Sequence, residues 1–394
     1  MPSLTRPHVP RYVLPPTVDE ELEYADLPII DLSKGDTTKG RSDLASQVCK
    51  AMTTQGFFYV INHGYTAAQS SQTQRIFDIA DVPFAQVNED EKRQYEGKME
   101  QSGSYEGYKL RQYFIILFSQ HIDGGVRDQV EMYGSKSPRT SWLKRRADIR
   151  KVHHDINKRQ HPQAIRPLLP EISDFVRHCH FEVVFPILRL LAIGLELPEE
   201  TLVNMHGFDT IGESYIRYMK YYPRSHEDEV KSKNVWLKGH TDIGSITLLP
   251  SQPIAALQML GPDGRWRWVK HIENALIVNA GDAIEFLSGG FYRATIHRVV
   301  QPPVSQRNYN RLGLAYFSRA DNDVQLSPLL ESPVLQRVGI KKHGRFGPDS
   351  TAPTMEAWVK GRTATYGRTE LKASEKEKGV EEQVINGVLV KHYS

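Results

Sequence analysis

The chain has 394 residues, of which 39% are hydrophobic and 25% are charged. This composition is typical of globular proteins and argues against a disordered, collagenous or membrane-spanning chain. Its formal charge of +3 is too small to indicate a nucleic-acid or membrane partner. The two cysteines, Cys49 and Cys179, form no CxxC motif, and the N-terminus lacks the apolar segment of a signal peptide. We therefore expect a cytoplasmic protein.

The N-terminal half alternates short strand patterns with helical ones. Residues 1–26 are rich in proline and polar residues, and they indicate an extended arm. The runs LPIIDLS (27–33) and GFFYVINHG (56–64) predict strands, because they are apolar, β-branched or aromatic and are bounded by turn residues. Residues 41–55 and 66–97 have the spacing of helices.

The longest helical pattern runs from 165 to 195 and is followed by a change of character. From 213 to 320 short β-rich runs alternate with turns, and PDGRW at 262–266 predicts a hairpin. Many short strands at such spacing favour a sandwich or barrel, here with a helical layer from the N-terminal half. Residues 373–382 (ASEKEKGVEE) predict an exposed helix.

The sequence His-x-Asp occurs four times, and only one copy lies in a strand-like context. On a strand, residues two apart point to the same face, so an imidazole and a carboxylate can share one metal ion. His240-Thr241-Asp242 has this context, since it precedes the apolar run IGSITLL. The other three copies lie in helical, charged or turn-rich stretches, at 121–123, 153–155 and 226–228.

A third candidate metal ligand, His297, follows 57 residues after His240 in the β-rich run YRATIHRVV. Two imidazoles and one carboxylate form the facial triad of non-haem Fe(II) oxygenases, which leaves positions open for substrates and O2. Arg311 lies 14 residues further on, in NRLGLAYFS. A buried guanidinium there is suited to a two-pronged pair with the carboxylate of a metal-bound oxo-acid.

These motifs together resemble the plant- and fungal-type Fe(II)/2-oxoglutarate-dependent dioxygenases, the superfamily that includes isopenicillin N synthase. The resemblance extends from about Pro28 to Ser318. It is carried, in the family's order and spacing, by LPIIDLS, GFFYVINHG, KYYP (220–223), GHTDIGSITLL, GDAIEFLSGGFYRATIHRVV and NRLGLAYF.

The resemblance implies an α+β fold, a double-stranded β-helix (jelly-roll) barrel with a surrounding helical layer that comes mostly from the N-terminal half. It divides the chain after the arm (1–26) into a dioxygenase region with the helical layer (27–210), a jelly-roll core that carries the Fe(II)/2-oxoglutarate site (211–320), and a C-terminal segment (321–394). In that last segment we expect a lid over the site, at 351–366, and an exposed tail.

The resemblance also implies the site residues. His240, Asp242 and His297 match the iron ligands, Arg311 matches the arginine that pairs with the distal carboxylate of 2-oxoglutarate, and Tyr222 matches a tyrosine that hydrogen-bonds this cosubstrate. The chain departs from the family pattern at two positions. Gly313 replaces the usual serine of Arg-x-Ser, and Lys220 stands where asparagine is common.

For substrate contacts we single out Tyr113, Phe114 and Phe317. Tyr113 and Phe114 belong to an aromatic stretch that precedes the barrel and corresponds to a region that often overhangs its mouth in the family. Phe317 follows Arg311 by six positions, so a regular strand would point both side chains to the same face.

The function implied is oxidation of a C–H bond of a small organic molecule by Fe(II), 2-oxoglutarate and O2, with release of succinate and CO2 and with ascorbate as a candidate reductant. We expect a role in specialised-metabolite biosynthesis, no nucleic-acid or membrane partner, and a monomer or homodimer. Two alternatives stay open. One is a 2-oxoglutarate-independent iron oxidase of the isopenicillin N synthase kind, and the other is a non-catalytic small-molecule binding protein on the same fold.

Overall fold

In the computed structural model, the residues that are described make up most of the chain. They are residues 7–65, 70–97, 105–111, 126–136, 161–208, 210, 214–340, 352–365, 371–377 and 379–393. Tyr113 and Phe114, which were expected to contact the substrate, lie outside the described residues, as do the His-x-Asp sequences at 121–123 and 153–155.

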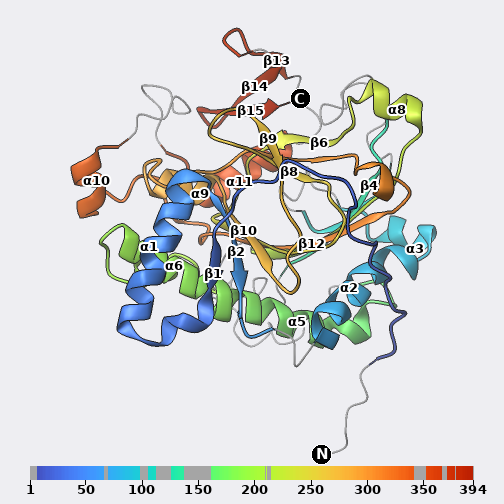
Figure 1. The fold of residues 1–394 in the computed structure, drawn as a ribbon, viewed down its shortest axis with the longest axis horizontal. Helices are drawn as coiled ribbons and strands as arrows, with labels where there is room; N and C mark the ends of the chain where they lie inside the picture. The colour runs from blue at the N-terminus through green and yellow to red at the C-terminus, as the bar shows by residue number, and fades with distance from the viewer. Residues whose placement is uncertain are drawn as a thin grey trace, which may run out of the picture.

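Two sheets form the centre of the molecule (Figure 1). The first has eight strands, in the spatial order β1 (Ile29–Asp31), β2 (Phe57–Ile61), β10 (Leu276–Ala280), β7 (Ile246–Pro250), β12 (Arg311–Ser318), β5 (Tyr215–Tyr221), β4 (Val130–Lys136) and β3 (Gly107–Lys109). The second has seven, in the order β13 (Lys372–Ala373), β14 (Val380–Ile385), β15 (Val388–Tyr393), β6 (Val235–His240), β11 (His297–Val300), β8 (Leu257–Leu260) and β9 (Trp266–Trp268). Only β1 and β2 pair in parallel among the described strands.

Helices connect the strands. They are α1 (Thr38–Thr54), α2 (Ser70–Ala85), α3 (Glu89–Gln94), α5 (Leu169–His178), α6 (Phe185–Gly194), α7 (Glu200–Val203), α8 (His226–Lys231), α9 (Asp282–Leu287), α10 (Pro333–Val338) and α11 (Met355–Ala364). A π-helical turn (Cys179–Val184) joins α5 to α6, and short 3-10 turns occur at Leu32–Asp36, Arg166–Leu168 and Val304–Gln306.

Apolar helix faces bind this layer to the sheet. In α1 the buried residues Leu44, Val48 and Met52 recur at a spacing of four, and Thr37 caps the helix by accepting a hydrogen bond from the Gly40 N–H. Figure 1 shows α1, α6, α5 and α2 along the same side of the sheet. The main hydrophobic core lies between these helices and the strands. The opposite face of the eight-stranded sheet is therefore the one that is turned towards the second sheet.

The sequence predicted this architecture well. The predicted strands at 27–33 and 56–64 contain β1 and β2, and the long helical pattern at 165–195 contains α5, the π-helical turn and α6. The hairpin predicted at 262–266 joins β8 to β9. The α+β jelly-roll with a helical layer is confirmed by the two packed sheets and by the neighbouring solved structures reported below.

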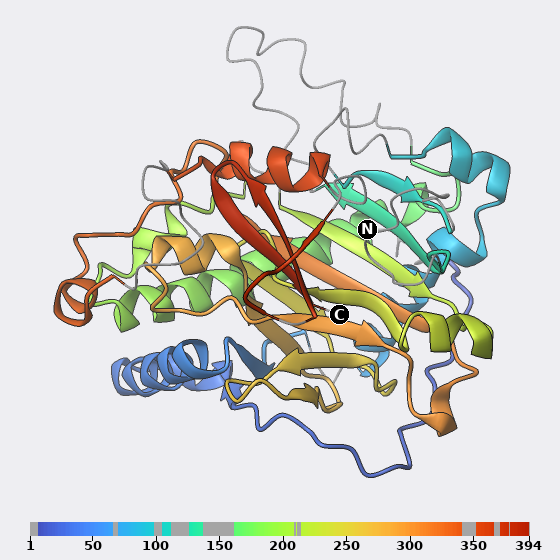
Figure 2. The ribbon, with the colours of Figure 1, turned by 90° about the horizontal axis from the view of Figure 1, so that it is seen from above.

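The predicted exposed helix at 373–382 is wrong. This interval contains part of β13 and β14, and β14 pairs with β15 in a hairpin. The turn of that hairpin is Asn386-Gly387, where both residues have positive φ angles, as two-residue hairpin turns require. Figure 2 shows the hairpin (dark red) beside α11. Tyr393 of β15 pairs with Gly239 of β6, so the C-terminal residues extend the second sheet.

None of the described helices is both long enough and apolar enough to cross a membrane.

Candidate metal centre and cosubstrate pocket

The second sheet brings His240 and His297 together. His240 ends β6 and His297 begins β11, and the two residues are directly paired in the antiparallel register. Asp242 follows His240 by two positions, on the turn that leads to β7. This pairing explains how two side chains that are 57 positions apart in the sequence can have ring centroids only 4.5 Å apart.

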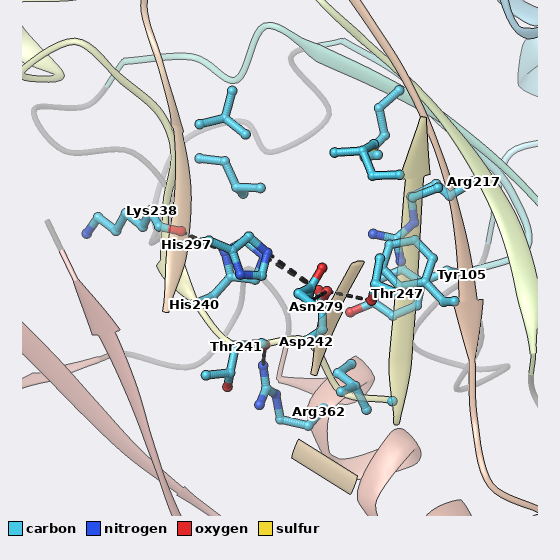
Figure 3. A pocket seen from close by; sticks show the side chains of 18 of the residues that line it. Tyr105, Arg217, Lys238, His240, Thr241, Asp242, Thr247, Asn279, His297 and Arg362 are labelled. Atoms are coloured by element: carbon cyan, nitrogen blue, oxygen red, sulfur yellow. Dashed lines mark hydrogen bonds and ion pairs between the residues drawn. The ribbon is translucent and has the colours of Figure 1, made fainter. Parts of the chain in front are cut away.

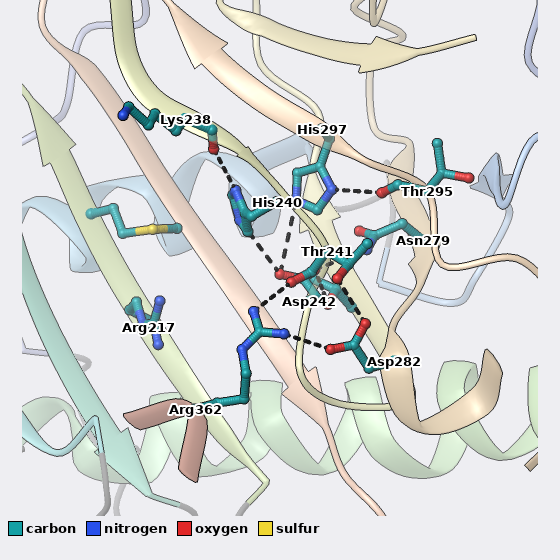
Figure 4. Close-up of polar contacts among 12 residues, drawn as sticks. Arg217, Lys238, His240, Thr241, Asp242, Asn279, Asp282, Thr295, His297 and Arg362 are labelled. Carbon is teal, nitrogen blue, oxygen red and sulfur yellow. Dashed lines mark hydrogen bonds and ion pairs between the residues drawn. The ribbon is translucent and has the colours of Figure 1, made fainter. Parts of the chain in front are cut away.

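The three side chains offer one atom each to a shared point (Figure 4). Oδ1 of Asp242 lies 3.9 Å from Nε2 of His240 and 3.8 Å from Nε2 of His297. All three ligand atoms lie within 4.8 Å of one another. Two metal–ligand bonds of about 2.1 Å can span the two distances from Asp242 to the histidines. Among the described residues this is the one group of three or more His, Cys, Asp or Glu side chains arranged to hold a metal ion.

Backbone carbonyls orient both imidazole rings. Nδ1 of His240 lies 2.8 Å from the carbonyl oxygen of Lys238, and Nδ1 of His297 lies 3.1 Å from that of Thr295. A carbonyl only accepts, so each Nδ1 carries the proton and each Nε2 keeps its lone pair for a metal. Burial lowers the pKa of His240 to about 3, with a further contribution from His297, so its ring is neutral at physiological pH.

Two side chains orient Asp242 through Oδ2, the carboxylate oxygen that does not face the histidines. Oδ2 accepts hydrogen bonds from Thr247 Oγ1 at 2.6 Å and from Asn279 Nδ2 at 2.8 Å. Burial raises the pKa of Asp242, but the two nearby imidazoles and these two hydrogen bonds outweigh it, and the pKa lies below its usual value. The carboxylate is thus ionised, with Oδ1 directed at the histidines.

A third support comes from α11, more than a hundred residues away in sequence. Arg362 donates to Asp282 Oδ2 at 2.7 Å and to the carbonyl oxygen of Thr241 at 3.2 Å, and Thr241 Oγ1 donates to Asp282 Oδ1 at 2.7 Å. Thr241, between His240 and Asp242, is therefore held through both its carbonyl oxygen and its hydroxyl (Figure 4). Arg362 belongs to no sequence motif that could have revealed this role.

The triad opens into a cavity between the two sheets (Figure 3). Its floor is the inner face of β4, β5 and β12. On β12 the residues that line it are Arg311, Ala315 and Phe317, and Arg319 continues the same alternation just past the strand. The residues between them, Leu312, Leu314 and Tyr316, belong instead to the core against the helices.

Arg311 lies in this cavity as expected, and it is 3% exposed. Among the described residues, its Nε has no hydrogen-bond partner and no carboxylate forms an ion pair with it. Its guanidinium lies 5.2 Å from the centre of the Tyr221 ring. Burial lowers the pKa of Arg311, but arginine remains charged in proteins, so a cation without a carboxylate partner faces the cavity.

Tyr222, which was expected to contact the cosubstrate, is not among the described residues that line this cavity. Its hydroxyl donates to Glu131 at 3.0 Å, while Tyr221 lines the cavity beside Arg311. Successive strand residues point to opposite faces, and the register pairs Arg311 with Tyr221. Lys220 shares the outward face with Tyr222 and forms an ion pair with Asp81 at 2.6 Å.

Phe317 lines the cavity. There the rings of Phe317, Tyr215 and Tyr105 surround the side chain of Arg217. The Phe317 and Tyr215 rings stack with centroids 4.9 Å apart. The Arg217 guanidinium lies 4.0 Å from the centre of the Tyr105 ring and 4.9 Å from that of Phe317. Figure 3 shows Arg217 and Tyr105 across the cavity from the two histidines. The sequence analysis missed Arg217 and Arg319, although the period-two alternation on β5 and β12 would have indicated them.

Two family models match the chain. Residues 214–320 match the 2OG-Fe(II) oxygenase superfamily, and residues 27–153 match the N-terminal region of non-haem dioxygenases in morphine synthesis. The chain belongs to the 2OG-Fe(II) oxygenase superfamily. The first match contains the complete triad and Arg311, and the predicted resemblance is confirmed.

Known relatives agree with this membership. Jasmonate-induced oxygenase 2 of Arabidopsis thaliana is 28% identical over 336 residues, which are 82% of this chain and 78% of that protein. The 2-oxoglutarate-dependent dioxygenase frbH of Dothideomycetidae sp. is 34% identical over 158 residues, 40% of this chain and 47% of its own. The fold matches a full-length Neurospora crassa protein solved in complex with alpha-KG, with a TM-score of 0.68 and 19% identity, over 90% of this chain and 100% of that one.

This member of the superfamily is a 2-oxoglutarate-dependent dioxygenase that uses Fe(II), 2-oxoglutarate and O2. The donor set fits that cofactor, because two neutral imidazoles and one carboxylate converge and leave the cavity side open. The membership favours this activity over the two alternatives left open by the sequence, a cosubstrate-independent oxidase and a non-catalytic binding protein.

Proposed function

We propose that His240, Asp242 and His297 ligate Fe(II), that Arg311 binds the distal carboxylate of 2-oxoglutarate, and that the enzyme oxidises a C–H bond of a small organic molecule. The observation that carries the cosubstrate assignment is Arg311 itself. A buried guanidinium that lacks a carboxylate partner is costly, so its retention facing the cavity indicates a ligand that supplies one.

Gly313, in place of the family's serine, leaves this assignment intact. A Cβ at this position would lie 3.4 Å from Nη1 of Arg311 and 3.8 Å from Cε of Met219, so a serine there could reach the ligand of Arg311. The glycine removes one neutral hydrogen bond, worth about 1 kcal/mol. The ionic pair with Arg311 is the stronger interaction. We therefore expect a modestly weaker affinity for 2-oxoglutarate than a serine would give.

When bound, the iron and its cosubstrate supply the oxidising chemistry, with succinate and CO2 as products. The chain's own residues orient the ligand atoms, through Lys238, Thr295 and Thr247, and hold 2-oxoglutarate at Arg311. The apolar and aromatic side chains of the cavity exclude water and position the substrate. A specialised-metabolite substrate and a cytoplasmic location complete the proposal. A relative named for jasmonate and a neighbouring structure solved with thymine, both small organic molecules, support the substrate class.

The test is an anaerobic titration of the metal-free protein with Fe(II) and then with 2-oxoglutarate, monitored through the visible iron-to-ketoacid charge-transfer band. We expect the band in the wild type and none in His240→Ala. Arg311→Gln should still form the band but need about tenfold or more 2-oxoglutarate, because a charge-assisted pair is lost. Arg337→Gln is the matched control, since Arg337 pairs with Glu196 on the surface.

Iron binding without a band would contradict the cosubstrate assignment and favour the oxidase alternative. An unchanged 2-oxoglutarate requirement in Arg311→Gln would show that another residue binds the distal carboxylate. Equal losses in Arg311→Gln and Arg337→Gln would indicate a general effect on the fold.

A further inference from the structure

The cavity contains a second buried arginine that the proposed function does not use. Arg319 is 2% exposed and lines the cavity, and its Nε has no hydrogen-bond partner in the described part of the chain. No described carboxylate forms an ion pair with it. The Tyr215 ring, whose centre lies 4.6 Å from the guanidinium, offers a cation–π contact that compensates only part of the desolvation cost.

The other cations at the cavity have partners of their own. Arg362 pairs with Asp282, and Lys238 pairs with Glu381 at 2.7 Å. Arg217 donates to the hydroxyl of Tyr215 at 2.5 Å and lies over the rings of Tyr105 and Phe317. Asp242 is the only carboxylate among the described residues that line the cavity. Fe²⁺ with Asp242 leaves one positive charge, and Arg311 adds a second. A 2-oxoglutarate dianion neutralises both charges. Arg319 then remains as a positive charge for which the proposed ligands provide no anion.

Arg319 is too far along β12 to share the cosubstrate with Arg311. The two residues are eight positions apart, which corresponds to roughly 25 Å along an extended strand. A five-carbon diacid is much shorter than this. Arg319 instead lies next to the metal-ligand turn, because a Cβ placed on Gly244, two residues after Asp242, would lie 3.1 Å from Cγ of Arg319.

The side chains around Arg319 are mainly aromatic. Tyr215 and Phe317 stack on each other, and Thr247, which pairs with Phe317 in the sheet, donates to Asp242. A ligand held at Arg319 would therefore have its apolar part against these rings and close to the triad. This is the arrangement expected for a substrate rather than for a second cosubstrate.

We propose that the primary substrate is an organic acid, whose carboxylate pairs with Arg319 while its apolar or aromatic body packs on Tyr215 and Phe317 and presents a C–H bond to the iron. This inference rests on the proposed function, since it assigns the substrate class of the same site. It makes Arg319 the specificity-determining residue for charge.

The test compares small acids with their neutral amides, which have the same apolar body. The probes are phenylacetate and phenylacetamide, indole-3-acetate and indole-3-acetamide, and hexanoate and hexanamide. Each is titrated into the anaerobic Fe(II)–2-oxoglutarate complex while its charge-transfer band is followed. A second readout, the rise in the unfolding temperature of the metal-free protein, needs no iron and so separates this proposal from the previous one.

In the wild type we expect at least one acid to bind about tenfold or more tightly than its amide. Arg319→Gln should abolish this preference and leave the 2-oxoglutarate requirement unchanged, and Arg319→Lys should restore part of it. Arg337→Gln should behave as the wild type. The unfolding temperature of each variant, measured without ligand, shows whether the fold is retained.

Acids with no advantage over their amides in the wild type would overturn the proposal, whether both bind or neither does. It would also be overturned if Arg319→Gln retained the preference, or if it raised the 2-oxoglutarate requirement as Arg311→Gln does. An absent charge-transfer band in the wild type would count against the proposed function alone, because the thermal readout would still compare acids with amides.

Discussion

Asp242 shows how single hydrogen bonds prepare this site. Its Oδ2 accepts from Thr247 and Asn279, so only Oδ1 is directed at the two histidines. Partners of this kind fix the orientation of a ligand before a metal arrives. The affinity for metal should therefore depend on residues that would never touch it.

Thr247→Val keeps the shape of the side chain but removes the hydrogen bond to Asp242. We expect the affinity for Fe(II) to fall about 10- to 100-fold, as is typical when such a partner is lost. Thr247→Ser keeps the hydroxyl and should bind Fe(II) nearly as the wild type does. The measurement is an anaerobic competition titration against a chelator. Equal affinities in the valine and serine variants would show that the Thr247 hydroxyl does not orient Asp242.

At the same scale, the sequence indicated that the triad and Arg311 lie near one another, and the structure places all four in one cavity, which Tyr221 lines instead of Tyr222. The His-x-Asp spacing and the distant His297 are properties of the motif itself. Whether Tyr221 or Tyr222 faces inward depends on the strand register, which pairs Tyr221 with Arg311. A single-position uncertainty in register exchanges the two faces of a strand, and no local pattern in the adjacent tyrosines resolves it.

Helix α11 supports the metal-binding turn through one buried ion pair. Arg362 is 8% exposed and Asp282 is fully buried, and the pair links α11 to the first turn of α9. The same guanidinium reaches the carbonyl of Thr241, inside the metal-binding turn. The segment was predicted as a lid. In its described part, 352–365, Arg362 and Thr365 line the cavity, and Trp358 and Val359 belong to the main core.

Arg362→Leu should lower the free energy of unfolding by about 3–5 kcal/mol, because it leaves the buried carboxylate of Asp282 without its cation. Lys360→Leu on the same helix is the matched control. Lys360 pairs with Glu356 at 2.7 Å, but its side chain is 61% exposed, so its loss should cost about 1 kcal/mol or less. Urea unfolding of the metal-free variants measures both. Similar costs for the two variants would contradict a structural role for the Arg362–Asp282 pair.

The C-terminal hairpin shows why composition alone can mislead a prediction of secondary structure. The lysine- and glutamate-rich run at 373–382 has the composition of a solvent-exposed helix, and it was predicted as one. The decisive signal lay further on, in Asn386-Gly387 between two alternating apolar runs, which is the strongest short-range indication of a hairpin. The pairing of β15 with β6 is a long-range contact that no local pattern contains.

At the scale of the whole molecule, buried histidines join the helical layer to the barrel. His180, in the π-helical turn, lies 2.7 Å from the hydroxyl of Tyr316 on β12. His206 lies 2.7 Å from the hydroxyl of Ser245, just before β7, and His180 also contacts the carbonyl of His206. Both rings are completely buried. The two layers are thus connected by neutral polar groups, as well as by apolar packing.

This connection makes the fold sensitive to acid. Burial lowers the pKa of both His180 and His206 to about 4. The unfolded chain takes up protons near pH 6.5 and the folded one does not, so the stability is complete above pH 6.5 and falls as the pH drops towards 4. Between pH 7.5 and 5.5 we expect these two residues to remove about 2–3 kcal/mol from the free energy of unfolding.

Urea unfolding of the metal-free protein at several pH values measures this loss. His206→Gln replaces one of the two rings with a group that does not titrate, so its loss over the same range should be smaller by about 1.3 kcal/mol. The relevant quantity is the slope with pH, which stays informative even if the variant is less stable at every pH. A slope identical to that of the wild type would show that His206 does not contribute.

The overall architecture was predictable because its signals are periodic and repeated. The helical spacing at 165–195 and the short strands from 213 onward each predicted one layer, and the order of motifs then implied the jelly-roll. The lining of the cavity was only partly predictable. Arg217, Arg319 and Arg362 come from three separate elements, and only the packing of the two sheets and α11 brings them to one place.

The alternation along β12 has a consequence for how this enzyme could diversify. Leu312, Leu314 and Tyr316 pack against the helical layer, whereas Ala315 and Phe317 line the cavity and pack in the smaller core between the sheets. Substitutions at 315 and 317 therefore alter the cavity while leaving the main core against the helices in place. A one-residue insertion in the strand would exchange the two sets and destroy both. Within this strand, evolution can change substrate specificity by substituting residues but not by inserting them.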